Sequence, residues 1–379
     1  MLRFLIKIAA WCMPRQIKNK IKHIMGIHYG STDNDVIFRV DSKIVNVAIH
    51  AGGGLGDFIV YSAIIDQLKE KTDCIIYIFT LYTNAAETIL NNRKNVHVFH
   101  QLNGHRNNAF DLALELDHFV QVREINVVAL KQKSPLLYDM AIKIMEYNKK
   151  NFPITDTVND QRYIIINRTK HLGLNRWTQL SCSGVFEMAS MTTDLGIGNN
   201  KTVLIKNKLI NTAYITLHCG AARDMGGMQQ TKVWPPHRME EFVQLFKEKY
   251  KDIKVVQVAM GNEPHINGID CLIHNADYED LKVVLHHSHC HIASEGGTVH
   301  IASHLGTKCI VVFGPTPVHY YGYPRNENIV SPLCANCMEV IPDWYKKCAK
   351  GYETARCMEA ITGKMIIEAF EIMLHGRNR

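Results

Sequence analysis

Ser294-Glu295-Gly296-Gly297-Thr298-Val299-His300-Ile301-Ala302 is the stretch of this sequence that decides the fold class. A short apolar run leads into an acid, two glycines and a threonine, and helix-forming residues then take over. Glycines at a strand-to-helix turn let a bulky anion approach the backbone, and the helix that follows directs unsatisfied N–H groups at that anion. The next apolar run, at 308–313, ends at a Gly-Pro turn. We therefore expect an α/β domain that binds the phosphates of a nucleotide or of a nucleotide-linked substrate.

The same alternation of strand and helix extends in both directions from this turn. Apolar, β-branched runs predict strands at 45–49, 74–79, 96–99, 111–116, 214–218, 255–259, 289–293 and 308–313. Helical spacing of apolar residues predicts helices at 58–69, 85–90, 236–250, 278–286 and 299–304. Strands that alternate with helices form parallel sheets through right-handed crossovers. The segment 134–193 is less regular.

Two domains are expected, because 379 residues exceed the usual size of a single domain. The best linker is Gly196-Ile197-Gly198-Asn199-Asn200, after which the pattern restarts. The predicted division is a basic and apolar helical extension at 1–44, a Rossmann-like domain at 45–195, a linker at 196–212, and a second Rossmann-like domain with a cysteine-rich tail at 213–379. Ligands of such folds bind in the crevice at the carboxyl ends of the strands.

The composition is that of an ordinary globular protein, with 46% hydrophobic and 21% charged residues. A net charge of +7 favours anionic ligands, but no basic stripe interleaved with aromatic residues indicates nucleic-acid binding. No apolar run reaches the roughly 18 residues that predict a membrane-spanning helix. Residues 1–24 fit either a short helix on an anionic membrane surface or a helix packed on the protein. Because they lack the layout of a signal peptide, we expect a cytoplasmic protein, in the first case peripheral on the inner membrane.

A second glycine-rich turn, Gly52-Gly53-Gly54-Leu55-Gly56-Asp57, follows the first predicted strand. Gly54 and Gly56 would let a ligand approach the backbone there. The spacing differs from the dinucleotide fingerprint, and no ribose-binding acid follows the next strand, so an NAD dehydrogenase is the least favoured enzyme class. Asp57 stands at a helix N-terminus, where it either acts in catalysis or only caps the helix.

Two further candidates follow strands of the C-terminal half. Lys232 precedes a helix opened by proline, where its ammonium either meets a diphosphate or is solvated beside Trp234. Glu263 follows the strand predicted at 255–259, and a carboxylate there either binds a ribose hydroxyl or is an ordinary loop residue.

The opening stretch supplies the remaining candidates for donor binding. Glu295 is placed to hold a sugar or ribose hydroxyl. Gly296, Gly297 and Thr298 can present N–H and hydroxyl donors to phosphate. His300 lies one turn into the helix, where it is either a ligand contact or a packed side chain. The histidines at 286–291 fit a strand entering this turn better than a metal site.

Four cysteines, Cys334, Cys337, Cys348 and Cys357, lie close together in the C-terminal tail. In a reducing compartment such a group favours either a tetrahedral zinc or iron site or reduced structural thiols. Four thiolates leave no open coordination position, so a metal there would be structural rather than catalytic.

Taken together, these motifs resemble glycosyltransferase family 9, the heptosyltransferase-like enzymes. The glycine-rich turn that ends at Asp57 matches the N-terminal motif of that family, and Lys232-Val233-Trp234-Pro235 matches its K-x-W-P segment. Residues 295–306 followed by Phe313-Gly314-Pro315-Thr316 resemble its D-S-G-x-x-H-L-A-x-x-L-G and F-G-P-T motifs, with Glu295 in place of the usual Asp. A cysteine-containing tail is also a feature of related, iron-containing enzymes.

The resemblance implies a GT-B fold, with two Rossmann-like domains facing across a cleft, the first for the acceptor and the second for the donor. It implies an inverting transfer that needs no catalytic metal. Asp57 would be the general base, and Lys232, assisted by Thr231, would neutralise the leaving diphosphate. By the same resemblance, the donor would be held by Glu263 at the ribose, Glu295 at the sugar, and Gly296, Gly297, Thr298 and His300 at the phosphates.

The sequence therefore favours an inverting glycosyltransferase that uses a nucleotide sugar, with ADP-heptose as the first choice. Its acceptor would be a bacterial surface glycan or lipopolysaccharide core, and the partner that accepts the sugar would be a glycan, a lipid-linked acceptor or a protein. Two alternatives stay open. One is a nucleotide-sugar epimerase or hydrolase of the same fold, and the other is a metal-stapled nucleotide-binding protein without turnover.

Overall fold

The computed structural model describes residues 43–100, 110–151, 162–188, 191–220, 230–261 and 263–375. The predicted N-terminal extension, apart from its last residues, and the predicted membrane contact of residues 1–24 lie outside the described residues. The described residues all belong to one compact unit, Asp41–Arg379. The domain boundaries expected at 44, 195 and 212 stay predictions.

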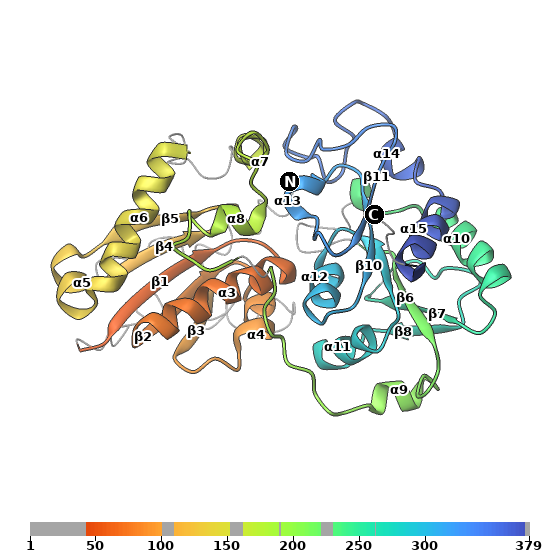
Figure 1. The fold of residues 1–379 in the computed structure, drawn as a ribbon, viewed down its shortest axis with the longest axis horizontal. Coiled ribbons are helices and arrows are strands. Elements are labelled where there is room, and N and C mark those ends of the chain that lie inside the picture. Colours follow the sequence, from red (N-terminus) through yellow and green to blue (C-terminus); the bar gives the residue numbers. More distant parts are fainter. Residues whose placement is uncertain are drawn as a thin grey trace, which may run out of the picture. The chain divides into compact units, whose positions relative to one another are not determined.

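The first sheet has five strands in the order β3-β2-β1-β4-β5 (Figure 1). The strands are β1 (Val45–Ala51), β2 (Cys74–Thr80), β3 (Val96–His100), β4 (Leu112–Leu116) and β5 (Val120–Ile125). Its helices are α3 (Leu55–Lys71), α4 (Thr83–Leu90), α5 (Val127–Lys133), α6 (Pro135–Asn151), α7 (Arg162–His171) and α8 (Arg176–Leu180). We call this part, residues 43–188, the N-lobe.

The second sheet has six strands in the order β11-β10-β9-β6-β7-β8. The strands are β6 (Tyr214–His218), β7 (Lys254–Ala259), β8 (Cys271–His274), β9 (His291–Ser294), β10 (Cys309–Phe313) and β11 (Glu327–Val330). Helical elements are α9 (Thr202–Lys206), η2 (Gln230–Lys232), α10 (Pro236–Lys249), α11 (Tyr278–His286), α12 (Gly297–His304), α13 (Val318–Tyr321), α14 (Arg356–Glu359) and α15 (Gly363–His375). We call residues 201–375 the C-lobe.

The predicted α/β class with parallel sheets is confirmed, with one exception at the edge of the first sheet. Every pairing in the second sheet is parallel, as are those among β1 to β4. Strand β5 instead runs antiparallel to β4. Residues 117–119 alone join them, and Asp117 N–H donates to Phe119 O at 3.0 Å. A parallel strand would need a much longer crossover connection.

The central strands carry the residues expected of buried parallel sheet. Every residue of β1 is buried, and its sequence, VNVAIHA, is rich in valine and isoleucine. Helix α3 begins at Leu55, three residues before the predicted start, because Asp57 caps it. Strands β5, β8 and β11, at 120–125, 271–274 and 327–330, were not predicted. The segment 134–193 also contains more helix than expected, since α6 alone runs from Pro135 to Asn151.

The strand order creates a switch point in each sheet. From β1 the chain adds β2 and β3 on one side and then β4 on the other. From β6 it adds β7 and β8 on one side and then β9 on the other. Ligands of open α/β sheets bind outside the carboxyl ends of the strands at such points. The turns after β1 and β9 are the two glycine-rich turns found in the sequence, so the topology places both of them at a binding position.

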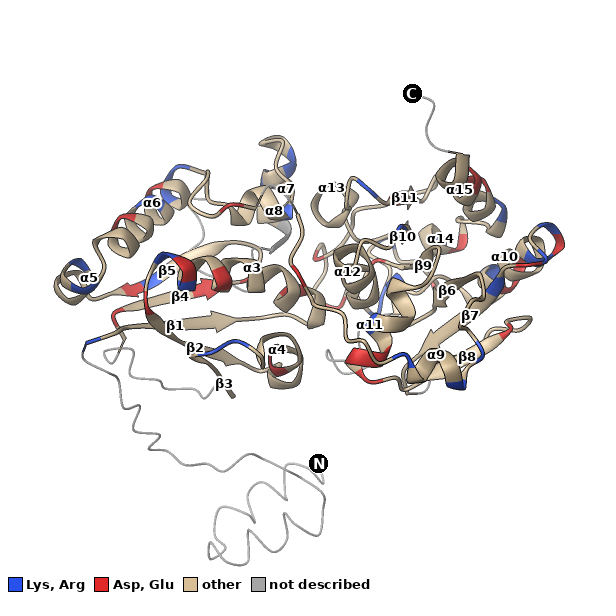
Figure 2. Ribbon diagram, turned by 60° about the horizontal axis from the view of Figure 1, so that its bottom comes forward, with Lys and Arg blue, Asp and Glu red and all other residues tan. Residues whose placement is uncertain are grey.

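The outer helices carry charges of both signs, as α6 and α10 show (Figure 2). Helix α15 packs on α10, where the Phe246 and Phe370 rings meet edge to face at 5.1 Å between centroids. Within the described ranges, no helix combines the length and apolar character that a bilayer crossing requires.

Candidate functional site

Asp57 is held at the start of α3 by its own turn. Gly54 N–H donates to Asp57 Oδ2 at 2.6 Å, which satisfies one of the free amides of the helix N-terminus. Gly53 has φ +99°, and a Cβ there would lie 2.2 Å from the same oxygen. Glycine is therefore required at 53 by both conformation and space. The Asp57 side chain keeps 28% of its surface exposed, so the carboxylate is capped yet reachable.

Arg176 is the partner that the sequence analysis missed. Its guanidinium forms an ion pair with Asp57 Oδ1, although the two residues are 119 positions apart. It also lies over the rings of Tyr61 in α3, at 5.7 Å, and Tyr321 in α13, at 5.8 Å. Burial lowers the pKa of Arg176, but Asp57 and Tyr61 raise it by more, so the guanidinium stays charged. Arg176 therefore joins the turn of the N-lobe to a helix of the C-lobe.

Lys232 and Glu295, two residues predicted from separate motifs, form a buried ion pair. Lys232 Nζ lies 2.6 Å from Glu295 Oε2. Burial raises the pKa of Glu295, but the Lys232 ammonium and His300 outweigh it and bring the pKa down to about 2. The Glu295 carboxylate is therefore ionised at neutral pH. A buried ion pair is costly to break, because either partner left alone is an uncompensated charge.

The segment around Lys232 is anchored to β9, the strand that precedes Glu295. Trp234, fully buried, donates its backbone N–H to Ser294 Oγ at 3.1 Å and its indole N–H to Ile361 O at 2.8 Å. The Thr231 hydroxyl donates to Trp344 O at 2.8 Å. Because that hydrogen is already used, this bond favours Thr231 as a residue that positions Lys232.

His300 connects the two glycine-rich turns. Its Nε2 lies 3.7 Å from Glu295 Oε1, and its Nδ1 lies 2.6 Å from the Tyr323 hydroxyl. A Cβ on Gly56, the neighbour of Asp57, would lie 2.3 Å from His300 Cδ2. Only glycine lets α3 and α12 approach this closely. The structure thus brings the turn of Asp57 against the residue that faces the Lys232–Glu295 pair.

A second polar network crosses the carboxyl ends of β6, β7 and β9. Glu263 accepts from Met260 N–H at 3.1 Å and lies 3.4 Å from His218 Nε2. The Thr298 hydroxyl lies 3.3 Å from His218 Nδ1 and 3.0 Å from His291 Nε2. Burial, and then His218, lower the pKa of His291 to about 3, so this imidazole is neutral. His218 was not predicted, although its place at the end of a predicted strand is a signal that could have found it.

The glycines that begin α12 are not required by crowding within the protein. Gly296 has φ 169°, an extended conformation that any residue adopts. A Cβ on Gly296 would meet only Ser294 O, at 3.8 Å, and one on Gly297 would touch Leu55 at 3.7 Å. Neither contact is closer than ordinary packing. Packing within the protein therefore does not require glycine at these two positions. A site where a ligand approaches the backbone would have this property.

The four tail cysteines are near one another and carry free thiols. Burial raises the pKa of Cys357 to about 12, with smaller contributions from Cys334, Cys337 and Cys348. Burial likewise raises the pKa of Cys337. Among the residues that the structure describes, no three His, Cys, Asp or Glu side chains are grouped as a metal site. Metal binding by these cysteines stays a prediction.

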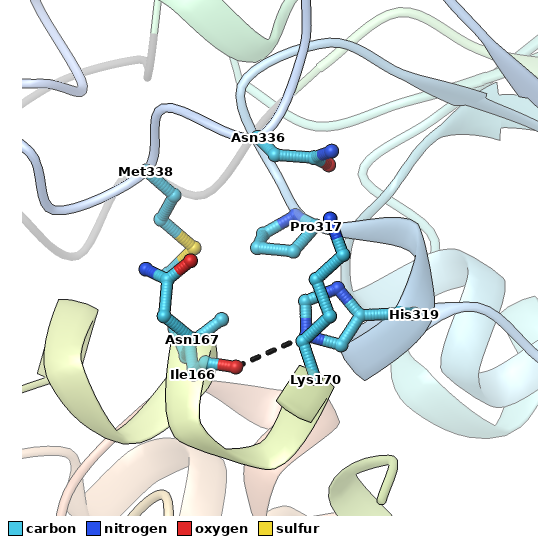
Figure 3. Close-up of a pocket in the computed structure, with 7 residues that line it drawn as sticks. All are labelled: Ile166, Asn167, Lys170, Pro317, His319, Asn336 and Met338. Carbon is cyan, nitrogen blue, oxygen red and sulfur yellow. Dashed lines mark hydrogen bonds between the residues drawn. The ribbon is translucent and has the colours of Figure 1, made fainter. Parts of the chain in front are cut away.

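Two cavities lie away from these residues. One, of about 20 Å³, is lined by Ile166, Asn167, Lys170, Pro317, His319, Asn336 and Met338 (Figure 3). It holds about one water molecule, and His319 Nε2 donates across it to Ile166 O at 3.0 Å. The other, of about 530 Å³, lies beside α6 and Lys71, at the opposite end of α3 from Asp57. Neither cavity contains a predicted site residue.

No protein-family model and no curated protein matches the sequence. Solved structures do match. The chain is similar to a family 9 glycosyl transferase from Veillonella parvula, with a TM-score of 0.51 and 14% identity over 89% of this chain and 98% of that one. It is similar to the iron-containing dodecameric glycosyltransferase TibC from enterotoxigenic E. coli, with a TM-score of 0.55 and 12% identity over 88% and 80%.

A third match is the ADP-heptose lipopolysaccharide heptosyltransferase II of E. coli, with a TM-score of 0.50 and 12% identity over 87% of this chain and 99% of that one. All three matches cover most of both lobes. At this sequence identity they establish the fold and nothing more. The fold predicted from the motifs is thereby confirmed: the chain folds like structures of family 9 glycosyltransferases.

Proposed function

We propose that this chain is an inverting glycosyltransferase that transfers a sugar from a nucleotide donor, ADP-heptose first, to a bacterial surface glycan or lipopolysaccharide core. The observation that carries the proposal is the close packing of His300 against Gly56. It brings Asp57 of the N-lobe and the Lys232–Glu295 pair of the C-lobe to the same contact between the lobes.

Asp57 is the proposed general base. An inverting transfer needs one group to accept the proton of the acceptor hydroxyl as its oxygen attacks the anomeric carbon. Among the described residues, Asp57 Oδ2 accepts from Gly54 N–H and Asp57 Oδ1 pairs with Arg176. A carboxylate oxygen accepts about two hydrogen bonds, so each can still accept a hydroxyl proton. The exposure of this side chain keeps it within reach of an acceptor.

Lys232 and the N-terminus of α12 are proposed to stabilise the leaving diphosphate. The bond from the anomeric carbon to the diphosphate breaks as the acceptor bond forms, and negative charge develops on the departing oxygen. The Lys232 ammonium, the amides at Gly296 and Gly297, and Thr298 and His300 are the groups available to meet that charge. With these donors in place, we propose that the transfer needs no catalytic metal.

The remaining donor contacts are assigned to two carboxylates. Glu263 is proposed to bind the ribose, since it follows β7 near the switch point. Glu295 is proposed to face the donor sugar while it holds Lys232. ADP-heptose is the first choice because one similar structure, that of TibC with a TM-score of 0.55, is a complex with ADP-D-β-D-heptose.

Acceptor binding is assigned to the N-lobe and to the residues that precede it in the sequence. We propose that the enzyme acts at the cytoplasmic face of the inner membrane, with residues 1–24 as a basic, apolar contact to anionic lipid. The acceptor is then a glycan, a lipid-linked acceptor or a protein.

Cys334, Cys337, Cys348 and Cys357 are proposed to hold a structural zinc or iron ion. Burial, and then the neighbouring thiols, raise the pKa of Cys337 and Cys357, and a divalent cation would offset this by stabilising the thiolates. Elemental analysis of the purified chain should find one ion per chain, which is lost in the Cys334→Ser and Cys337→Ser double variant. Protein that is folded and free of metal as isolated would overturn this assignment.

A panel of nucleotide sugars tests the main proposal. A ligand that binds only the folded state raises the melting temperature according to its affinity. ADP-heptose should raise it, while UDP- and GDP-sugars should not. Transfer should then require an acceptor and invert the anomeric configuration, and it should persist in EDTA. Donor consumption without an acceptor would favour the epimerase or hydrolase alternative, and binding without any product would favour a non-catalytic nucleotide-binding protein.

A further inference from the structure

A buried chain of hydrogen bonds runs from the segment between the lobes to the candidate donor site. Thr193 N–H donates to His304 Nδ1 at 2.7 Å. His304 Nε2 lies 3.1 Å from the Tyr323 hydroxyl, which lies 2.6 Å from His300 Nδ1. His300 Nε2 ends the chain 3.7 Å from Glu295 Oε1. All five residues are buried.

The chain has a direction, which begins at Thr193. A backbone N–H only donates, so His304 Nδ1 accepts and the hydrogen of the neutral imidazole is on Nε2. That N–H donates to the Tyr323 oxygen. Tyr323 has one hydrogen, which is left for His300 Nδ1. His300 therefore accepts at Nδ1 and carries its own hydrogen on Nε2, which faces Glu295.

The other end of the chain agrees with this order, because it calls for a hydrogen on His300 Nε2. The Glu295 carboxylate is ionised, because its pKa is about 2, and it can only accept. An Nε2–H toward it is attractive, whereas an Nε2 lone pair would be repulsive. Thr193 O, the group that would suit the reverse order, lies farther from His304 Nδ1, at 3.3 Å.

The surroundings keep the chain in this protonation state. Burial, and then His300, lower the pKa of His304 to about 3, so its imidazole is neutral. Burial raises the pKa of Tyr323, so its hydroxyl keeps the hydrogen. Trp177 packs beside the His304 ring at 5.4 Å and fixes its orientation.

We propose that Tyr323 and His304 are positioning residues that hold His300 as its Nε2–H tautomer, directed at Glu295 and the donor. The contact of His300 with the sugar donor rests on the function proposed above. The first hydrogen-bond donor of this series is the Thr193 amide. The nucleotide-sugar site is therefore correctly protonated only when the segment between the lobes lies in this position. The lobe connection and the donor site are thereby coupled without a shared ligand.

Imidazole nitrogen NMR of the full chain tests the order directly, without any substrate. Two-bond ¹H–¹⁵N spectra distinguish the two neutral tautomers of each histidine. At pH 7.5 both His300 and His304 should carry hydrogen on Nε2. Hydrogen on Nδ1 of either ring would overturn the proposal, and so would an unchanged His300 tautomer in Tyr323→Phe, which lacks the hydroxyl.

Two substitutions at position 304 separate the effect of this series of hydrogen bonds, which we call the relay, from the packing of the His304 ring. His304→Gln keeps an amide donor near the Nε2 position and so can still donate to Tyr323. His304→Asn keeps an acceptor for Thr193 N–H but does not reach Tyr323. The proposal expects the His300 tautomer to survive in the Gln variant and to become mixed in the Asn variant. The same response in both would mean that only the ring of His304 matters, and would overturn the relay.

Affinity for ADP-heptose provides the functional readout. Loss of one oriented hydrogen bond should weaken binding about tenfold in Tyr323→Phe and His304→Asn, and His304→Gln should stay within about twofold of wild type. Tyr214→Phe is the matched control, because it loses a buried bond to Val284 O, 2.8 Å in length, outside the relay. An equal loss in the control would overturn the functional claim. If wild type does not bind ADP-heptose, the proposed donor fails, while the NMR spectra still decide the relay.

Discussion

The turn after β1 and the turn after β9 use the same elements and hold their carboxylates in opposite ways. In both, a buried parallel strand ends in glycines and a helix follows. Asp57 lies inside its helix, caps it, and stays 28% exposed. Glu295 precedes its helix, and its side chain is 8% exposed, between Lys232 and His300.

This difference separates two kinds of task. A carboxylate that must take a proton from an incoming group has to be accessible, as Asp57 is. A carboxylate that holds a cation and an imidazole in place attracts them most strongly when it is shielded from water and fully paired. On the proposed function, the same turn would serve as a reactive site in the N-lobe and as a positioning site in the C-lobe.

The largest expected effect comes from neutralising the exposed carboxylate. Asp57→Asn should lower the rate of transfer by about 10²–10⁴-fold, because general-base catalysis is lost. Donor affinity should stay near that of wild type. The matched control is Asp66→Asn in the same helix, which removes only a part-buried pair with Arg93. A transfer rate in Asp57→Asn equal to that of the control would exclude Asp57 as the base.

The buried carboxylate should instead affect stability. Glu295→Gln leaves the Lys232 ammonium buried without its partner and should lower the free energy of unfolding by about 3–5 kcal/mol at pH 7. Adding Lys232→Met should recover part of that loss. Because the pKa of Glu295 falls from 4.5 to about 2 on folding, its contribution is complete above pH 4.5 and is lost as the pH falls toward 2.

Urea unfolding of the two single variants and the double variant measures this coupling. A Glu295→Gln variant as stable as wild type would contradict the contrast between the two turns.

The contact between the turns can be tested with one methyl group. Gly56→Ala adds a Cβ only 2.3 Å from His300 Cδ2, and overpacking of this kind costs about 1–3 kcal/mol. Alanine would otherwise favour an exposed helix by about 1 kcal/mol, so the sign of the change identifies the steric effect. Thermal unfolding should show destabilisation, whereas Gly198→Ala, with only Glu279 Oε2 nearby at 3.7 Å, should not. A Gly56→Ala variant more stable than wild type would disprove the close approach.

The last expected effect is a pH slope rather than a fixed change in stability, and it is measured only over the short window from pH 6.5 to 5. His291 and His304 have pKa values of about 3 in the folded chain, well below their usual value of 6.5. The unfolded chain therefore binds more protons between pH 6.5 and 3, and stability falls as the pH falls through that window. Each histidine contributes up to about 1.4 kcal/mol per pH unit below 6.5. His304→Gln should remove one of the two contributions, and an unchanged slope between pH 6.5 and 5 would refute it.

The sequence predicted most of the candidate site, but it did not predict how the residues pair. Lys232 and Glu295 were each identified from a local motif, and the structure joins them as one ion pair. Arg176 escaped notice because it lies in a short helix without a motif, and its partner is 119 residues away. Tyr323 was missed for the same reason. Periodicity and spacing describe only neighbours along the chain.

The sequence alone determined the alternation of strand and helix, the two glycine-rich turns and the chemical types of the residues in them, because these depend on local propensity and hydrophobic period. The tertiary structure decided which carboxylate is exposed, which is paired, and which histidine tautomer faces Glu295. Burial and hydrogen bonding between distant residues set those properties, and they exist only once both sheets have formed and α3 has met α12.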